Sequence, residues 1–450
     1  MEATKTDEVG MVGDQKKTIE SSSRRRVRAL IWLPFLMMGI VLLCCPNYQW
    51  ESQRATPFGG DFIQDWSGAH IVSSADYARL YDAEYFRSVQ HDESLVGFQW
   101  SESSYYPPIY PPYYYQLMLP FSMMDYRVAA VVWAIVSSLL VCATFALLYH
   151  HYQHVRPGMQ YLIAATILFS PFLICLNIGQ KSTMLLLLFA STFLLLRGRR
   201  PLLAGIVFGL IAFKPHLVIL ILAAMIWKRQ WVFSAGCLAT IGSLVGLAWW
   251  KSPELCWGYL HAIQATGDYV STGGYVLADA HSLWGGLQLL MGQAADAVAV
   301  KTTVLAVSLV GVVLLALAIR GPIEFDSPRF SVQFSLLLVA TILLSPHLYF
   351  YDLTVLLLPI CLVGSVGKEA LGGENASRAI YIVMVLLFFG AGTFAQIAFA
   401  TRIQPSVVLM SVLVLQLSLA CMETRRSRTT PEVQPSKATI DVLRRVVAGN

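Results

Sequence analysis

Long apolar runs alternate with short polar or basic segments along most of the chain. A helix that crosses a bilayer needs about 20 mostly apolar residues, so this pattern predicts an all-α polytopic membrane protein. We expect about twelve membrane-spanning helices. The predicted spans lie near 29–45, 127–149, 160–178, 183–196, 202–227 (two short spans), 231–250, 302–319, 331–345, 353–367, 379–400 and 405–421.

The run from 202 to 227 is interrupted at its middle by Lys214, Pro215 and His216. A single span would place these residues near the bilayer centre, where a lysine costs a few kcal/mol. Two short spans that meet at Lys214 would instead bring them to the outer face. We therefore predict a hairpin at this position.

In this arrangement every second loop between the spans lies in the cytoplasm. The basic clusters fall in nearly all of these loops, as expected because cytoplasmic loops are enriched in Lys and Arg. Both termini are then cytoplasmic, and the two large loops are extracytoplasmic. The first of these loops is too long for a simple connector, so we expect it to contain interfacial helices. The predicted regions are a disordered N-terminal segment (1–26), a transmembrane domain (27–422) with outer loops at 46–125 and 251–300, and a cytoplasmic tail (423–450).

The composition supports this class and excludes several others. Hydrophobic residues make up 56% of the chain and charged residues only 13%, whereas about a quarter of a globular domain is charged. The net charge of +5 comes from short clusters between apolar runs, which argues against a nucleic-acid partner. The sequence has no phosphate-binding glycine loop, dinucleotide motif, metal-ligand spacing or disulfide framework, so we predict neither a cofactor nor a metal.

The same alternation of inner and outer loops places the polar residues of the apolar domain on the outer face of the membrane. Independent exceptions would not be expected to segregate in this way, so we predict one site that faces the outside. The residues on this face are Asp61, Asp65, Gln180, Lys181, Lys214, His216, His281, His347 and Asp352.

Asp61 follows two glycines in the first outer loop and precedes a stretch with Phe62 and Trp66. A partly buried carboxylate in such a loop can act as a general base. An aspartate at this position also readily caps a following helix, and that alternative stays open. Asp65 lies one helical turn later on the same face and would take over as base if Asp61 were structural.

The stretch from Tyr105 to Tyr115 combines six tyrosines with four prolines. Proline favours an extended backbone. Tyrosine rings such as that of Tyr106 suit the membrane interface and also stack on sugar faces. Interfacial anchoring and sugar binding are both compatible with this composition.

Several cations and histidines are candidates for binding an anionic substrate group. Lys214 and His216 could neutralise a phosphate, and Lys181 could do so or extend to the membrane interface. His347 and Asp352 lie five residues apart at the entrance of a predicted span, which fits either substrate contact or a hydrogen bond in the core. The segment from Asp279 to His281 is a weaker candidate, because polar residues are common in outer loops.

Taken in order, these motifs resemble glycosyltransferase family 87, the polyprenol-phosphate-mannose-dependent α-1,2-mannosyltransferase-like members of the GT-C superfamily. The resemblance covers roughly residues 58–360. It is carried by Asp61-Phe62, Trp66-Ser67-Gly68-Ala69, Leu80-Tyr81-Asp82, Tyr106-Pro107-Pro108, Gly179-Gln180, Ala204-Gly205, Lys214-Pro215, Ser345-Pro346-His347 and Tyr351-Asp352.

The resemblance implies a GT-C fold that transfers a mannose or related sugar from a polyprenyl phosphate to a lipid or glycan acceptor, with inversion. It maps the catalytic base onto Asp61, although this chain has Asp65 where the family often has an aromatic residue. Gln180, Lys181, Lys214, His216, His347, Tyr351, Asp352 and Tyr106 would contact the donor phosphate or the substrate. The expected location is the inner (plasma) membrane, with the active site outside the cytoplasm.

A secondary transporter or lipid flippase would use intramembrane polar residues as a pathway. Such proteins tend to show internal repeats, and the sequence has no convincing repeat. A scaffold protein without activity is a third alternative.

Overall fold

The computed structural model describes residue 39 and residues 56–166, 168–271, 277–292 and 297–429. Throughout these ranges the regular structure is helical, apart from one isolated antiparallel bridge between Ala280 and Tyr349. The predicted all-α membrane fold is thus confirmed at the level of class. The predicted N-terminal segment 1–26, the first span at 29–45 (except Gly39) and tail residues 430–450 lie outside the described residues.

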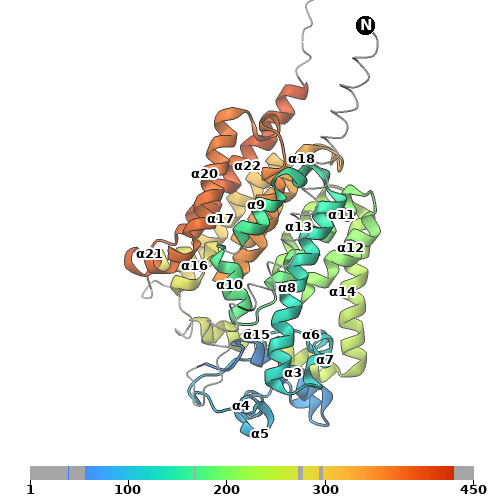
Figure 1. The fold of residues 1–450 in the computed structure, drawn as a ribbon, viewed down its shortest axis with the longest axis vertical. Helices are drawn as coiled ribbons and strands as arrows, with labels where there is room; N and C mark the ends of the chain where they lie inside the picture. Colours follow the sequence, from blue (N-terminus) through green and yellow to red (C-terminus); the bar gives the residue numbers. More distant parts are fainter. Residues whose placement is uncertain (1–38, 40–55, 167, 272–276, 293–296, 430–450) are drawn as a thin grey trace, which may run out of the picture.

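Short helices form a cap at one end of a bundle of long helices (Figure 1). The cap corresponds to the described part of the predicted first outer loop. Its central helix, α3, is buried on nearly all sides and packs against α6, α7 and α8. The helices of the cap are α3 (Phe62–Ser73), η2 (Tyr77–Arg79), α4 (Ala83–His91), α5 (Glu93–Val96), α6 (Pro112–Leu117) and α7 (Leu119–Ser122).

The first half of the bundle contains both long and broken helices. The predicted span 160–178 is divided into α9 and α10, whose axes are bent by 56°. Pro171 stands in the first turn of α10, where its missing N–H is tolerated at a helix start but would disrupt a continuous helix. The elements are α8 (Tyr126–His151), η3 (Gln153–Val155), α9 (Arg156–Thr166), α10 (Ser170–Asn177), α11 (Ser182–Arg197), α12 (Pro201–Gly209), η4 (Leu210–Phe213), α13 (His216–Trp227) and α14 (Trp231–Lys251).

The chain reverses at Lys214, as the hairpin interpretation predicts. A Cβ on Gly205 would meet the backbone of Phe233, and a Cβ on Gly209 would meet Thr240. Residue numbers therefore rise together along α12 and α14, so these two helices run parallel. Because α13 connects them through short turns, it must run in the opposite direction.

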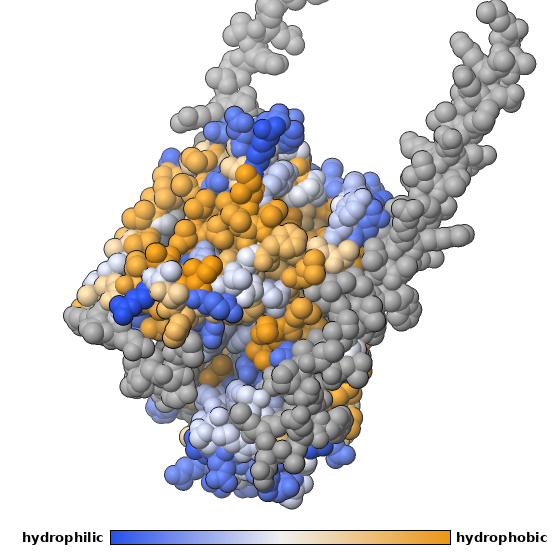
Figure 2. Space-filling view, turned by 60° about the vertical axis from the view of Figure 1, so that its left-hand side comes forward, coloured by the Kyte–Doolittle hydropathy of each residue, from blue (hydrophilic) through white to orange (hydrophobic). Residues whose placement is uncertain are grey.

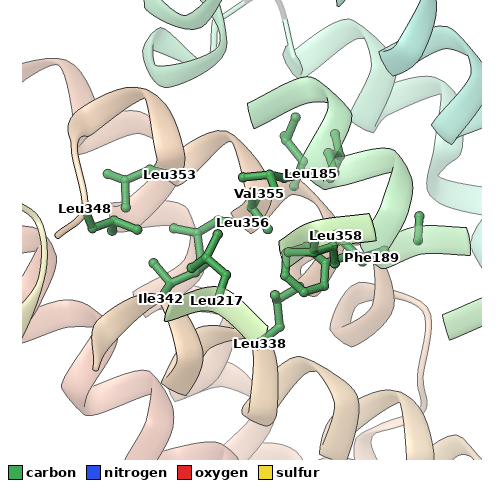
Figure 3. Packing of buried hydrophobic residues seen from close by; sticks show 14 of the residues in the cluster. Leu185, Phe189, Leu217, Leu338, Ile342, Leu348, Leu353, Val355, Leu356 and Leu358 are labelled. Atoms are coloured by element: carbon green, nitrogen blue, oxygen red, sulfur yellow. The ribbon is translucent and has the colours of Figure 1, made fainter. Parts of the chain in front are cut away.

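The second half of the bundle surrounds α18, which is buried at every position from Phe330 to Leu343. A helix that is apolar on all sides belongs in the interior. Leucines from α11, α13, α18 and the segment after it meet in this core (Figure 3). The elements are α15 (Pro253–Ser271), η5 (Leu277–Asp279), α16 (Leu283–Met291), α17 (Ala297–Ala318), α18 (Pro328–Leu343), η6 (Phe350–Leu356), α19 (Leu357–Gly364), η7 (Lys368–Leu371), α20 (Glu374–Gly390), η8 (Ala391–Thr393), α21 (Phe394–Thr401) and α22 (Pro405–Thr429).

Five helices in the described ranges are long and apolar enough to cross a membrane, or six if the bent α9–α10 pair is one span. Five further apolar helices are shorter, with 10–17 residues. The expected total of about twelve spans stays a prediction. An apolar band lies between polar ends on the face drawn in Figure 2, as the surface of a helical membrane protein requires.

Candidate active site

A cavity of about 590 Å³ lies where the cap meets the bundle. Its wall combines the start of α3, the Tyr/Pro segment, α10, the segment around Tyr349 and the turn between α20 and α21. The lining residues are Asp61, Gln64, Tyr105, Tyr106, Pro107, Ile109, Ser170, Ile174, Ile178, Gln180, Asp279, His347, Tyr349, Phe350, Tyr351, Ala391, Gly392 and Ala395.

Asp61 occupies the N-cap position of α3, but its side chain makes no capping hydrogen bond. Its carboxylate instead accepts a 2.6 Å hydrogen bond from Nε2 of Gln180. The alternative that Asp61 serves as a helix cap is therefore not supported. Burial raises the pKa of Asp61 above its ordinary value of 3.8, against the opposing effect of the Gln180 bond and of nearby lysines.

Two interlocked turns bring Asp61 and Gln180 together. Gly60 has a φ of +62° and Gly179 a φ of +66°, a region that favours glycine. A Cβ on Gly60 would lie 2.6 Å from the Cα of Ile178, and a Cβ on Gly179 would lie 2.6 Å from the Cβ of Phe62. Larger residues would push the turns apart, so these glycines permit the contact between the carboxylate and the amide.

Asp65 is fully buried and does not line the cavity. Its carboxylate forms a 2.7 Å ion pair with Lys181, which is equally buried. It also accepts a 3.1 Å hydrogen bond from the hydroxyl of Tyr114. The interpretation that Lys181 extends to the membrane interface is wrong, because its ammonium lies inside the protein, 4.7 Å from the ring centroid of Tyr110.

Lys214 and Asp352 form a second buried ion pair, at 2.7 Å. Asp352 also accepts a 2.8 Å hydrogen bond from Oγ of Ser182. Neither residue lines the cavity, and neither does the half-buried His216, which begins α13 beside them. The structure brings Lys214 and Asp352 into contact, and the predicted contact of these residues with substrate stays a prediction.

Three other predicted residues, His347, Tyr351 and Tyr106, do line the cavity. Burial, together with the charge of Lys214, lowers the pKa of His347 to about 4. The imidazole is therefore neutral near pH 7 and acts as a hydrogen-bonding group there.

Most rings of the tyrosine-rich segment pack inside the cap. Tyr110, Tyr114 and Tyr115 are buried, and only Tyr105 and Tyr106 reach the cavity. The hydroxyl of Tyr113 donates a 2.8 Å hydrogen bond to the carbonyl of Ala212, which joins the cap to the hairpin. Interfacial anchoring is therefore not the main role of this segment.

Asp279 is a second carboxylate on the cavity wall, although its segment is only a weaker candidate on sequence grounds. Its segment is held in place by the bridge between Ala280 and Tyr349 and by a 2.9 Å bond from the amide of His281 to Leu348. The His281 ring is fully buried beside Ser406, with Nδ1 2.7 Å from the hydroxyl. No local pattern marks Asp279, because only the long-range pairing brings it to the cavity.

The polar lining is acidic and aromatic. No Lys or Arg side chain lines the cavity in the part of the chain that the structure describes. Over the same residues, no three His, Cys, Asp or Glu side chains come together in a way that could hold a metal ion. The wall thus presents two carboxylates, two amides, a neutral imidazole and phenolic hydroxyls, which are groups that bind and deprotonate hydroxyls.

A helical membrane protein with a carboxylate-lined cavity of this kind has the features of an enzyme embedded in the bilayer. A model of glycosyltransferase family 87 matches residues 109–346, more than half of the chain. The chain belongs to glycosyltransferase family 87, and the protein is a membrane glycosyltransferase. A comparison with curated proteins gives no match.

The matched range contains Gln180, Lys181, Lys214 and His216 but not the first-loop carboxylates. Asp61 precedes the match, and His347 and Asp352 follow it. The assignment of the base therefore depends on the geometry of the cavity rather than on the family match.

Proposed function

We propose that the protein transfers a sugar from a polyprenyl-phosphate donor to an acceptor hydroxyl, with Asp61 as the general base. The observation that carries this proposal is the contrast between two carboxylates in the same short stretch. Asp61 lines the cavity and is oriented by Gln180, whereas Asp65 is enclosed and paired with Lys181. A base must reach the proton that it removes.

In the proposed reaction, an Oδ atom of Asp61 takes the proton from the acceptor hydroxyl. The acceptor oxygen forms a bond to the anomeric carbon as the bond from that carbon to the phosphate oxygen breaks. The electron pair leaves with the polyprenyl phosphate, and attack from the opposite face inverts the configuration. The raised pKa of Asp61 makes its carboxylate a stronger base than an exposed aspartate.

The donor phosphate leaves as an anion and needs hydrogen-bond donors more than a proton. His347, Tyr351 and Tyr106 are the predicted residues that reach the cavity and can donate. Lys214 lies behind them, with Nζ 5.4 Å from the ring centroid of Tyr351. Because Asp352 offsets the charge of Lys214, we propose a long-range contribution for this lysine rather than a direct clamp on the phosphate.

The apolar part of the wall, including Ile174 of α10 and Ile178 just after it, suits the first isoprene units of the donor. A mannose or related sugar would then lie against Tyr106 and Tyr351, since aromatic rings pack on the apolar faces of sugars. We place this site on the extracytoplasmic side of the inner membrane, because the basic turns at the other end of the bundle fit the cytoplasm.

The test supplies membranes that contain the full chain with a radiolabelled polyprenyl-phosphate mannose and cell-derived acceptors. We expect label to move to an acceptor with inverted anomeric configuration, and this transfer to be lost in Asp61→Asn. The exposed Asp76 of the cap, changed to Asn, is the matched control and should keep the wild-type rate. Transfer from a soluble nucleotide sugar instead, or passage of intact donor across the membrane without transfer, would overturn the proposal.

A further inference from the structure

A second cavity, of about 610 Å³, is lined by Trp227, Lys228, Arg229, Arg320 and Gly321. Two separate turns form it, one between α13 and α14 and one after α17. Helix α14 has 21 residues and extends from this cavity toward α15 and the cap. At 1.5 Å per residue that length is about 31 Å, so this basic pocket and the Asp61 cavity lie at opposite ends of the bundle.

Contacts between the two turns fix the shape of the basic pocket. Nζ of Lys228 donates a 2.6 Å hydrogen bond to the carbonyl of Gly321 and lies 4.8 Å from the ring centroid of Trp227. Arg229 has a φ of +55°, which directs the chain sharply out of α13 into the turn. The lysine therefore joins the two turns, and the arginines stand on either side of the junction.

The two arginines have no acceptor for their guanidinium groups among the residues that the structure describes, and both are exposed. Asp326, on the segment that follows Arg320, is instead bound by Arg199 through two hydrogen bonds. The guanidinium groups of Arg229 and Arg320 therefore give the pocket positive charge that no described carboxylate pairs with. Paired guanidinium groups suit a phosphate because each can donate two parallel hydrogen bonds.

The position of the pocket identifies the source of that phosphate. Trp227 is 50% exposed, and on the next helix Trp231 is 60% and Val232 54% exposed. Tryptophans with outward-facing apolar neighbours are typical of the level of lipid head groups. The cations are thus at the depth of the lipid phosphates, with apolar surface below them for the acyl chains.

We propose that the basic pocket binds the head-group phosphate of an anionic phospholipid in the leaflet opposite the Asp61 cavity. The lipid would bridge the α13–α14 turn and the turn after α17, next to the tether from Lys228 to Gly321. Basic pockets between transmembrane helices are a general means of binding anionic lipids. This inference does not depend on the donor or on the base of the transferase reaction.

The test compares purified full-length protein with Arg229→Gln/Arg320→Gln in phosphatidylcholine nanodiscs that contain increasing phosphatidylglycerol. Retained lipid is counted by native mass spectrometry, and the Tm is measured in parallel. We expect phosphatidylglycerol to raise the Tm of the wild type, since a ligand stabilises the state that it binds. The double variant should bind phosphatidylglycerol about thirtyfold more weakly, as two basic residues at an anionic surface predict.

Arg200→Gln is the matched control, because Arg200 is exposed at the same end of the bundle but does not line the pocket. It should retain the wild-type response to phosphatidylglycerol. An unchanged response in the double variant would overturn the proposal. An equal rise in Tm with glycerol phosphate or inorganic phosphate alone would also overturn it, because the occupant would then be a free anion and not a lipid.

Discussion

Asp61 and Asp65 lie only one helical turn apart in the sequence, but their surroundings are entirely different. Asp61 faces a cavity and shares a hydrogen bond with an amide, whereas Asp65 shares its charge with a buried ammonium. An ion pair of this kind leaves no room for a substrate and no uncompensated charge. The same residue type thus lines the cavity at one position, where we propose that it acts as the base, and forms a buried ion pair at the other.

The pH dependence of the reaction tests the role of Gln180. A general base works in its deprotonated form, so kcat/KM should fall as the pH decreases through the pKa of Asp61, which burial places above 3.8. The Gln180 bond favours the charged carboxylate. Gln180→Leu should therefore move this acid limb to higher pH in a pH–rate profile of kcat/KM.

Gln64→Leu is the control for that profile. Gln64 lines the same cavity, but its amide donates to the carbonyl of Pro107 and not to Asp61. Its substitution should leave the acid limb where it is in the wild type, whatever it does to the rate. An acid limb that shifts equally in both variants would show that the shift reports the cavity as a whole.

The buried pair of Asp65 and Lys181 predicts an asymmetric effect on stability. Asp65→Asn leaves the Lys181 ammonium buried without a counter-charge, so the free energy of unfolding should fall by about 3–5 kcal/mol. Asp65→Leu with Lys181→Met removes both charges and should recover most of that loss. Denaturant unfolding in detergent measures both, and an equal loss in the two variants would contradict the assignment.

At the scale of the elements, glycines set how closely the hairpin packs on α14. Gly205 of α12 lies against the backbone of Phe233, so an added methyl group has no space. Close approach of this kind is a common means of helix association in membranes. Helix α12 can therefore lie directly on α14, and the returning α13 closes the hairpin beside it.

Gly205→Ala should therefore destabilise the protein by about 1–3 kcal/mol, the usual cost of overpacking. Gly246→Ala, on α14 itself, is the matched control because an added Cβ meets nothing within 4 Å. Alanine is also the better helix former, so this variant should be neutral or slightly more stable. Thermal unfolding of the two variants in the same detergent separates packing from helix propensity, and equal Tm values would contradict this account.

The sequence predicted the elements well where apolar length alone decides them. The predicted spans 127–149 and 231–250 correspond to α8 and α14 to within two residues. The break at Pro171 and the 3-10 turn that opens the segment from Phe350 were not predicted. Pro171 cannot continue a regular helix through its own position, and η6 packs against α10 and α11.

At the scale of the whole molecule, the sequence predicted that the polar residues gather in one region but not how they pair. Burial decides which carboxylate is free, and burial depends on contacts between residues more than 100 positions apart, such as Lys181 with Asp65. Asp279 was only a weaker candidate on sequence grounds for the same reason. The composition and the alternation of inner and outer loops indicate a polar site. Only the fold shows which of its residues line the cavity and which are buried in the core.

The two ends of the molecule are also different in charge. The Asp61 cavity is lined by carboxylates and aromatic rings, whereas the basic pocket at the other end is lined by Lys228, Arg229 and Arg320. This difference in charge agrees with the positive-inside rule and supports the orientation that we propose for the chain in the bilayer. It also places the proposed sugar transfer and the proposed lipid site in opposite leaflets.

The most direct test of the central claim is the single-turnover rate of sugar transfer by Asp61→Asn and Asp279→Asn, with the amount of folded protein and the donor affinity measured for each. If Asp61 is the base, Asp61→Asn should bind the donor nearly as the wild type does and transfer it about 10²–10⁴-fold more slowly. Asp279→Asn should keep most of the rate. Full transfer by folded Asp61→Asn, with loss in Asp279→Asn, would contradict the assignment and move the base across the cavity.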